Sequence, residues 1–148
     1  MFRLPVMLVL TMSLIMVVVA KLGVGYDLAI KNNKAISAVI FLAGLLVIGI
    51  GGYQFRKANT TFDPSKPENT SSLVTHGVYK LSRNPMYVGF FMWLLSVAIF
   101  LDDAINAIAL IVFILLANRL YIIPEEKALD TLFGAKYTEY KSRVRRWI

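Results

Sequence analysis

The sequence predicts an all-α integral membrane protein with four transmembrane helices and a C-terminal amphipathic helix at the membrane interface. Of the 148 residues, 57% are hydrophobic and only 17% are charged, which is too apolar for an ordinary soluble domain. Four long segments are almost free of charge and lack the alternation of strands, and helices satisfy their own backbone hydrogen bonds in lipid. The length permits one domain, so we expect residues 1–148 to form a single membrane domain.

The four apolar segments are expected to cross the membrane at residues 4–22, 35–53, 86–101 and 104–123. A hydrocarbon core of ~30 Å needs roughly 20 helical residues, which suits the first, second and fourth segments. The third is shorter, so it must begin close to Pro85 or lie in a locally thin region. The first is longer than the apolar part of a signal peptide and lacks a convincing cleavage site, so we expect a retained helix.

The connections follow from the residues between these segments. Residues 23–34 join the first two helices into a hairpin, whereas the loop 54–82 is rich in Asn, Thr, Ser and Pro, and its first half is expected to be extended and mobile. Asp102-Asp103 form the turn between the third and fourth helices, and one of them is expected to cap the fourth. Residues 49–52 (Gly-Ile-Gly-Gly) lie inside the second helix and indicate close helix packing.

Positive charge is unevenly distributed along the chain. All of the 16 lysines and arginines except Lys21, Lys31 and Lys34 lie at the N-terminus, in the second loop, near the end of the fourth helix or in the C-terminal tail. The positive-inside rule therefore places both termini and the second loop in the cytoplasm, and we expect the plasma (inner) membrane. The net charge of +7 suits anionic lipid, and the charges flank helices rather than form one basic face, so we expect no nucleic-acid partner. The chain has no cysteine, no metal site is expected, and the sequence does not indicate an oligomeric state.

A dense group of polar and aromatic residues lies directly before the third apolar segment. It reads His76-Gly-Val-Tyr-Lys-Leu-Ser-Arg-Asn-Pro-Met-Tyr-Val-Gly89. Pro85 suits the first turn of a helix, whose free N–H groups and positive dipole end would then face the cytoplasm. Each residue alone is compatible with a simple interfacial anchor. The density of the whole group favours a binding site at the membrane surface.

A second group, Arg119-Leu-Tyr-Ile-Ile-Pro-Glu-Glu126, follows the fourth apolar segment. An ionisable residue in an apolar helix is a functional candidate, although Arg119 is close enough to the helix end to reach the headgroups instead. Glu125 and Glu126 suit a cationic ligand, or alternatively the first turn of a C-terminal helix. From Pro124 onward apolar residues recur at helical spacing between charged ones, which predicts the amphipathic helix. They are Leu129, Leu132, Phe133, Tyr137 and Tyr140.

The order of these groups resembles the C-terminal half of the integral-membrane methyltransferases, the isoprenylcysteine carboxyl methyltransferases and the related phospholipid N-methyltransferases. The resemblance runs from about His76 to Ile148 and includes a Phe-Gly-x-x-Tyr-x-x-Tyr run, whereas the first two helices resemble the family only in kind. The family usually has Arg-His-Pro where this chain has Arg83-Asn84-Pro85. Its common Val-Pro-Arg-Phe ending corresponds to residues 144–147 (Val-Arg-Arg-Trp), so the proline is lost and the arginine is kept at Arg146.

The resemblance implies an S-adenosylmethionine-dependent methyltransferase that acts in the membrane on a lipophilic acceptor, either the carboxylate of a prenylated cysteine-like molecule or a phospholipid amine. The implied cofactor site consists of the cytoplasmic segments 76–89 and 119–148. The implied cofactor-binding residues are His76, Gly77, Tyr79, Arg83, Asn84, Pro85, Tyr87, Gly89, Glu125 and Glu126. The implied catalytic residues are Arg119, Glu126 and Arg146. The arginines would fix an acceptor carboxylate, and Glu126 would hold an amine or accept its proton.

Two other functions remain open. An NADPH-dependent reductase of the same superfamily is the enzymatic alternative, although four helices leave little room for a dinucleotide and a sterol. The other alternative is a non-catalytic membrane subunit that keeps the fold. Binding of S-adenosylmethionine, of NADPH or of neither separates the three.

Overall fold

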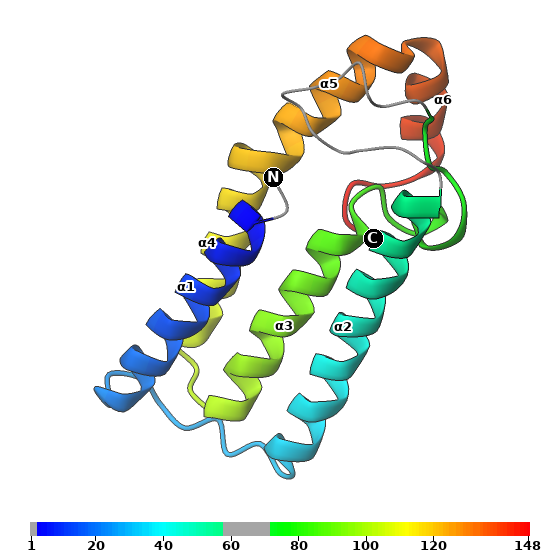
Figure 1. The fold of residues 1–148 in the computed structure, drawn as a ribbon. Coiled ribbons are helices and arrows are strands. Elements are labelled where there is room, and N and C mark those ends of the chain that lie inside the picture. The colour runs from blue at the N-terminus through cyan, green and yellow to red at the C-terminus, as the bar shows by residue number, and fades with distance from the viewer. Residues whose placement is uncertain (1–2, 58–71) are drawn as a thin grey trace.

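The computed structural model describes residues 3–57 and 72–148, and the named elements in these ranges are helices (Figure 1). Their bounds are α1 Arg3–Lys21, α2 Asn33–Lys57, η2 Gly77–Lys80, α3 Pro85–Leu101, α4 Asn106–Ala117, η3 Asn118–Ile122, α5 Ile123–Phe133 and α6 Ala135–Arg143. The all-α class is therefore confirmed. The second loop was predicted to begin at residue 54, but residues 54–57 form the last turn of α2. The rest of its predicted extended first half lies outside the described residues.

Each of the four apolar segments forms a helix close to its predicted bounds. Two helices are long and apolar enough to cross a membrane, α2 and the continuous helix Asn106–Phe133. Two shorter apolar helices accompany them, Pro5–Lys21 and Pro85–Leu101. The predicted number of four membrane spans stays a prediction, because length and composition alone identify only two of these helices.

The helix α3 is the centre of the bundle, since it packs against α1, α2 and α4 (Figure 1). Its buried side chains include Phe90 and Leu94, which join Met16 of α1 and Phe113 of α4 in one apolar core. The outward faces of α1, α2 and α4 expose large apolar side chains, as helices surrounded by lipid do. Examples are Met7, Leu14, Val39, Leu42, Leu46, Ile108, Ile111 and Leu115.

Glycines bring α2 and α3 close together. A Cβ on Gly89 would lie 2.7 Å from the carbonyl oxygen of Gly44, and a Cβ on Gly44 would lie 2.9 Å from the carbonyl oxygen of Gly89. Gly51 also packs on α3, with 3.1 Å between its hypothetical Cβ and Cγ of Met86. The predicted packing role of residues 49–52 is wrong for Gly49 and Gly52, which face open space. The close contact uses Gly51 from this group together with Gly44, two helical turns earlier.

Replacing Gly89 with alanine should therefore destabilise the protein. The new methyl group would meet backbone atoms of α2, which cannot move aside as a flexible side chain can. Overpacking of this kind typically costs ~1–3 kcal/mol. We expect a lower midpoint of thermal unfolding in detergent for Gly89→Ala and no decrease for Gly49→Ala, whose Cβ meets nothing within 4 Å. Equal midpoints for the two variants would show that the helices are not in close contact at Gly89.

The turn between α3 and α4 is built differently from the prediction. The helix α4 begins at Asn106 and has no side-chain cap, because Oδ1 of Asp103 accepts the N–H of Ile105, one residue before the helix (3.1 Å). Asp102, with φ +53°, ends α3 and its Oδ1 accepts the N–H of Ile30 in the first loop (3.2 Å). The two aspartates thus hold the first loop and the turn together at this end of the bundle.

The predicted separate amphipathic helix from Pro124 onward is also wrong in its boundaries. Proline lacks an N–H, but the chain compensates with one π-helical turn, in which the N–H of Ile123 bonds to the carbonyl of Asn118 five residues earlier. The helix therefore continues from α4 through η3 into α5. It ends at Gly134, whose φ of +50° favours glycine, and α6 starts in a new direction. Together α5, α6 and the C-terminal residues cover one end of the bundle (Figure 1).

Candidate functional site

The start of α3 is fixed against the C-terminal segment. The backbone N–H of Arg83 donates to the carbonyl of Arg145 (3.0 Å), and Nδ2 of Asn84 donates to the carbonyl of Arg146 (3.1 Å). Pro85 occupies the first turn of α3, as its missing N–H and fixed φ favour. Residues 83–85 and residues 145–146, which are far apart in the sequence, therefore form one unit at the mouth of the bundle.

The carboxylate of Glu126 lies between two guanidinium groups. Arg83 donates to Oε1 of Glu126 from Nη2 at 2.8 Å and from Nε at 3.1 Å. Arg146 donates to Oε2 from Nη2 at 2.7 Å and from Nε at 3.2 Å. Burial opposes the ionisation of Glu126, but the hydrogen bonds from Arg146 and Arg83 outweigh it and lower the pKa of this carboxyl below its usual value. Glu126 is thus an ionised link between α3, α5 and the C-terminal segment.

Arg83 also supports the last turn of α6. Its Nη1 donates to the carbonyl of Val144 at 2.7 Å and, more weakly, to that of Lys141 at 3.4 Å. These carbonyls belong to the end of α6, where helical acceptors lack partners within the helix. All three nitrogens of Arg83 are therefore engaged in holding the C-terminal segment.

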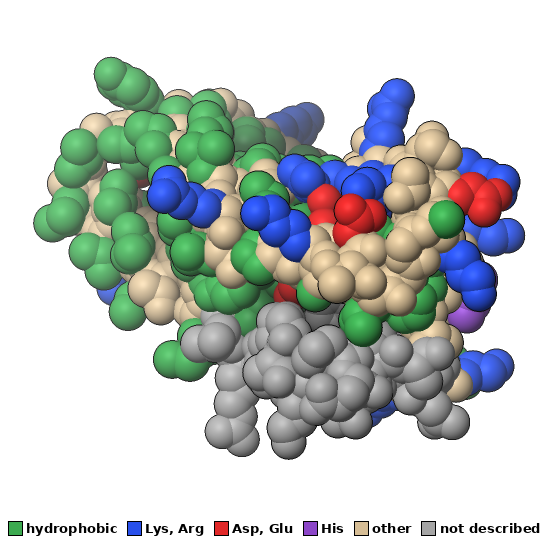
Figure 2. Space-filling model, turned by 90° about the horizontal axis from the view of Figure 1, so that it is seen from above, with side chains coloured by type: hydrophobic (Ala, Val, Ile, Leu, Met, Phe, Trp, Pro, Cys, Tyr) green, Lys and Arg blue, Asp and Glu red, His purple; other side chains and the backbone are tan. Residues whose placement is uncertain are grey.

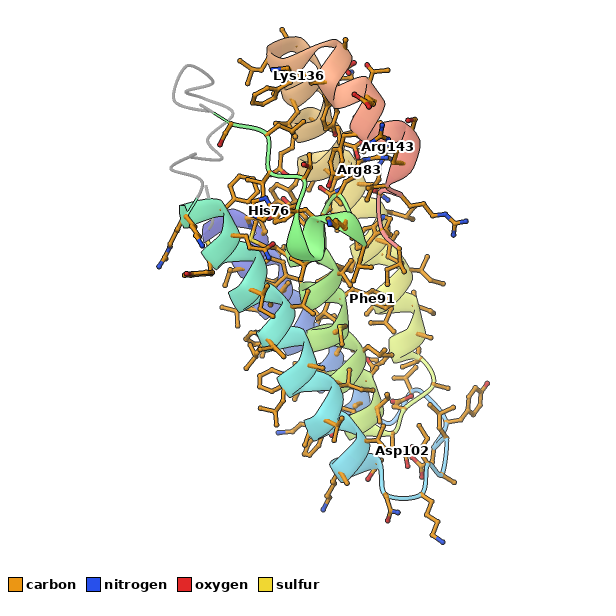
Figure 3. The ribbon with its side chains drawn as sticks, turned by 90° about the vertical axis from the view of Figure 1, so that its right-hand side faces the viewer. His76, Arg83, Phe91, Asp102, Lys136 and Arg143 are labelled. Atoms are coloured by element: carbon orange, nitrogen blue, oxygen red, sulfur yellow. The ribbon has the colours of Figure 1, made fainter. Side chains whose placement is uncertain are left out.

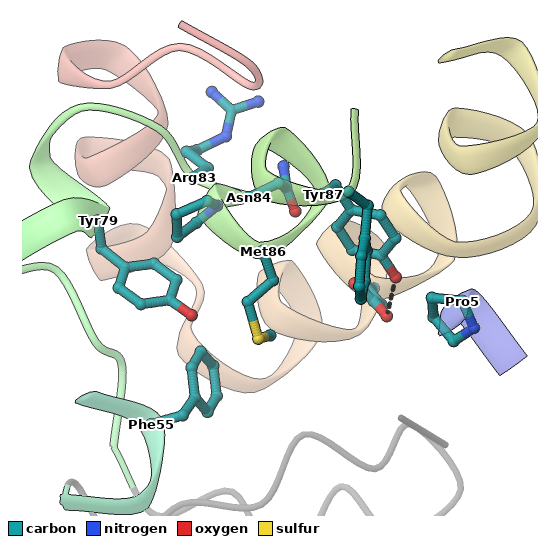
Figure 4. Close-up of a pocket in the computed structure, with 10 residues that line it drawn as sticks. Pro5, Phe55, Tyr79, Arg83, Asn84, Met86 and Tyr87 are labelled. Atoms are coloured by element: carbon teal, nitrogen blue, oxygen red, sulfur yellow. Dashed lines mark hydrogen bonds between the residues drawn. The ribbon is translucent and has the colours of Figure 1, made fainter. Parts of the chain in front are cut away.

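Glu125 has a different environment although it is the adjacent residue. It lies just beyond Ile123, where the apolar part of the long helix ends, and only 6% of its surface is exposed. Its Oε1 accepts the hydroxyl of Tyr87 at 2.9 Å (Figure 4). Burial, opposed by the Tyr87 hydrogen bond and reinforced by the neighbouring Glu126 charge, raises the pKa of Glu125 to about 7. A buried carboxyl of this kind suits a cationic partner.

Two compartments meet at Glu125. The first, the bundle-side compartment, lies between the start of α1, the end of α2 and the start of α3 and has an empty volume of about 530 Å³ (Figure 4). It is lined by Pro5, Phe55, Tyr79, Arg83, Asn84, Pro85, Met86, Tyr87, Phe90 and Glu125. The second, the tail-side compartment, lies under α5 and α6 and has an empty volume of about 430 Å³. It is lined by Phe55, Ser72, Leu73, Val74, Tyr79, Arg83, Asn84, Glu125, Glu126, Leu129, Tyr137 and Tyr140.

Five residues line both compartments, and the two sides differ in chemistry. The shared residues are Phe55, Tyr79, Arg83, Asn84 and Glu125. Beyond the shared residues, Tyr87 is the one described polar side chain that lines the bundle-side compartment, and the others are apolar. The tail-side compartment has three further apolar side chains and four polar ones, which are Ser72, Glu126, Tyr137 and Tyr140. The shared residues therefore form a junction between a mainly apolar space and a space that carries more polar groups.

Two buried phenols at this site have no hydrogen-bond partner among the described residues. They are the hydroxyls of Tyr79 and Tyr137, on side chains only 4% and 1% exposed. Burial raises the pKa of both phenols well above the usual value, so both stay protonated and able to donate. Buried hydroxyls normally have partners, so each of these two can donate to a polar ligand or to an ordered water in the tail-side compartment.

Comparison with known proteins places the chain in a family. The sequence profile described as phospholipid methyltransferase matches residues 33–136, which is most of the chain. The chain belongs to the phospholipid methyltransferase family. This confirms the predicted resemblance. The match differs from the predicted extent of 76–148, because it begins at residue 33 and so includes α2, and it ends at residue 136.

Two similar relatives are protein-S-isoprenylcysteine O-methyltransferases. The chain is 31% identical over 122 residues to the protein-S-isoprenylcysteine O-methyltransferase of Saccharomyces cerevisiae, covering 80% of this chain and 50% of the relative. It is 41% identical over 80 residues to protein-S-isoprenylcysteine O-methyltransferase B of Arabidopsis thaliana, covering 52% and 39%. The chain thus spans about half the length or less of these relatives.

A solved structure agrees with these relatives. It is that of the eukaryotic intramembrane Ras methyltransferase ICMT, isoprenylcysteine carboxyl methyltransferase, determined without a monobody. The likeness has a TM-score of 0.50 at 26% sequence identity and covers 81% of this chain and 54% of the other. The membrane-embedded helical architecture of the family therefore extends over most of this chain.

The structure brings together most of the residues that the family resemblance implied, and leaves out four. Tyr79, Arg83, Asn84, Pro85, Tyr87, Glu125 and Glu126 line at least one compartment. Arg146 reaches the same unit through Glu126. His76 is exposed directly before η2, and Gly77 is exposed as its first residue. Gly89 packs on α2, and Arg119 is exposed on the long helix. None of these four residues lines either compartment.

Several residues that line the two compartments were not predicted from the sequence. Phe55, Met86 and Phe90 lie in apolar helices, where a pocket-lining side chain cannot be told from a core or lipid-facing one. Tyr137 and Tyr140 belong to the implied segment 119–148 but are not among the individually predicted site residues, yet both are buried and line the tail-side compartment. Their place in the Phe-Gly-x-x-Tyr-x-x-Tyr run, next to the break at Gly134, was the signal that could have identified them.

Proposed function

We propose that this protein binds S-adenosylmethionine at the junction and in the tail-side compartment, and that it transfers the methyl group to a lipophilic acceptor held in the bundle-side compartment. The observation that carries this proposal is the meeting of two chemically different spaces at one buried carboxylate, Glu125. A polar, cationic donor and an apolar acceptor need such an arrangement, because each must leave its own solvent before they react.

The polar groups of the site suit the proposed cofactor. Bound S-adenosylmethionine supplies an electrophilic methyl group on a sulfonium, together with an amino group, a carboxylate and ribose hydroxyls. Glu125 would compensate the positive charge, and the orphaned hydroxyls of Tyr79 and Tyr137 would donate to its oxygens or nitrogens. Glu126 would act indirectly, since both of its oxygens are held by Arg83 and Arg146.

The acceptor would approach from the side of the bundle. Pro5, Met86 and Phe90 offer an apolar surface for a lipid tail, which the bilayer can deliver laterally. Both acceptor classes stay within the proposal. A carboxylate would rely on Tyr79 and Asn84 or on a rearranged Arg146, because Arg119 is outside the compartments and Arg83 is fully engaged. An amine would use Glu125, and its proton would pass to that carboxylate.

We propose the following membrane arrangement. All four apolar helices span the bilayer, with the site at the cytoplasmic face of the plasma (inner) membrane. Arg56 and Lys57 end α2, and further lysines and arginines gather over the end that carries α5 and α6 (Figure 2). Arg119 is exposed close to the end of the apolar segment, where its long side chain reaches the headgroups.

Equilibrium binding in detergent tests the proposal directly. The purified protein should bind S-adenosylmethionine and not NADPH. Preferential NADPH binding would support the reductase, and binding of neither would support the non-catalytic subunit. With labelled methyl donor and a lipid extract as acceptor, base-labile label would identify a methyl ester and base-stable label in a lipid would identify an N-methyl product.

A further inference from the structure

A third concave surface lies outside the proposed catalytic site. This surface, the basic groove, runs between η2 and α6 and is lined by Lys80, Lys136, Glu139, Tyr140, Arg143 and neighbouring residues. Its space of about 1130 Å³ includes volume that is open to solvent, as expected of a groove on the surface. Tyr140 separates the groove from the tail-side compartment, since it lines both and its hydroxyl donates to the carbonyl of Tyr79 at 2.6 Å.

The groove carries an excess of positive charge. Lys80 and Lys136 have no ion-pair partner among residues 5–57 and 72–148, and Arg143 is paired with Glu139 on the surface of α6. Three cations therefore face one acid around a concave surface. Glu139 offsets only one of the three positive charges, and like charges repel one another, so this arrangement favours an anion that neutralises the excess.

The position of the groove indicates where that anion comes from. Arg143 lies two residues before Arg145. The carbonyl of Arg145 accepts the N–H of Arg83, which lies two residues before the start of α3 at Pro85. Lys80 precedes Pro85, the first residue of α3, by five positions. Figure 3 shows Arg143 close to the level of Arg83, and Lys136 farther from the bundle. One end of the groove thus lies where the apolar helices end, which is the level of lipid headgroups.

We propose that the basic groove binds the phosphate-bearing headgroup of an anionic membrane lipid. Lys80 and Arg143 contact the phosphate at the headgroup level, and Lys136 neutralises charge farther out. Leu73 and Val144, which also line the groove, pack on the glycerol part of the lipid. This site is separate from the junction at Glu125, so the proposal does not depend on methyl transfer.

The test compares two triple variants with the same change in net charge. Lys80→Gln/Lys136→Gln/Arg143→Gln removes the cations of the groove, and Lys21→Gln/Lys31→Gln/Lys34→Gln removes three exposed lysines from the opposite end of the bundle. In an uncharged detergent, short-chain phosphatidylglycerol should raise the unfolding midpoint of the wild-type protein and of the second variant equally. The groove variant should bind this lipid roughly 100-fold more weakly, since each of the three basic residues near a membrane surface contributes about fivefold.

Three outcomes would overturn the proposal. Equal weakening in both variants would show an effect of net charge alone. Stabilisation by inorganic phosphate at the same concentration as by the lipid would identify a free-anion site. Phosphatidylglycerol binding to the wild-type protein that is unchanged by 0.5 M salt would exclude an electrostatic site, and this last measurement needs no variant to fold. Short-chain phosphatidylcholine serves as the zwitterionic control and should bind no better to the wild type than to the groove variant.

Discussion

Replacing Glu126 with glutamine should be among the most destabilising single changes in this protein. The side chains of Glu126 and Arg83 are only 11% and 12% exposed, and Arg146 is 38% exposed. The substitution would leave two guanidinium groups facing each other without a counter-charge. Breaking a buried pair by removing one partner typically costs about 3–5 kcal/mol, so we expect a large fall in the free energy of unfolding. We also expect faster proteolysis in α6 and the C-terminal segment, which Arg83 and Arg146 connect to α3.

The surface pair of Arg143 with Glu139 provides a matched control. Its side chains are 72% and 62% exposed, so Glu139→Gln should change the free energy of unfolding by at most about 0.5 kcal/mol. Arg146→Gln should lie between the two, because Arg146 is more exposed than Arg83. A loss for Glu126→Gln as small as that for Glu139→Gln would show that the carboxylate does not hold the two segments together.

The same cluster predicts a dependence of stability on acid. The folded state lowers the pKa of Glu126 below the ordinary value of 4.5, so its contribution to stability is complete above that pH. The contribution is lost as the pH falls through the folded pKa, when the carboxyl is protonated. Glu126→Gln should therefore be less sensitive to acid than the wild-type protein, as measured by the unfolding midpoint between pH 6 and pH 3.

Replacing Glu125 with glutamine should abolish most of the affinity for S-adenosylmethionine while the protein stays folded. Glutamine keeps the shape of the side chain and can still accept the hydroxyl of Tyr87, but it cannot compensate a positive charge. Loss of one partner from a buried charged contact costs at least about 2 kcal/mol, which corresponds to a decrease in affinity of roughly 30-fold or more. Equilibrium binding measures this, with the exposed Asp130→Asn on the same helix as a control. Undiminished affinity in Glu125→Gln would show that Glu125 does not contact the cofactor.

The raised pKa of Glu125 also predicts how the affinity for S-adenosylmethionine depends on pH. Only the ionised carboxylate attracts a cation, and the pKa of Glu125 is about 7, so affinity should fall about tenfold for each pH unit below that value. In Glu125→Gln this slope should disappear. Tyr87→Phe removes the hydrogen bond that opposes the effect of burial, so it should raise the pKa of Glu125 and move the midpoint of the binding curve to higher pH. A pH profile identical in all three proteins would show that another group controls binding.

Much of the fold was predictable from local features of the sequence. Apolar segments without charge became helices within a few residues of their predicted ends, and Pro85 begins α3 as its fixed φ favours. The predicted helix boundaries were wrong where the tertiary structure overrode the usual effect of a single residue. Pro124 would ordinarily begin or interrupt a helix, yet one π-helical turn carries the chain past it. Asp103 could cap a helix, yet it bonds to Ile105 before the helix starts.

The sequence by itself determined which residue types gather directly before the third apolar segment and directly after the fourth, and their order identified the family. Only the tertiary structure decided how neighbouring residues divide their roles. Glu125 and Glu126 are adjacent in the chain, but successive positions on a helix point about 100° apart. One carboxyl therefore meets Tyr87 and the buried junction, and the other meets Arg83 and Arg146. The same reason separates Arg119 from the site that its neighbours form, because its side chain leaves the long helix on an exposed face.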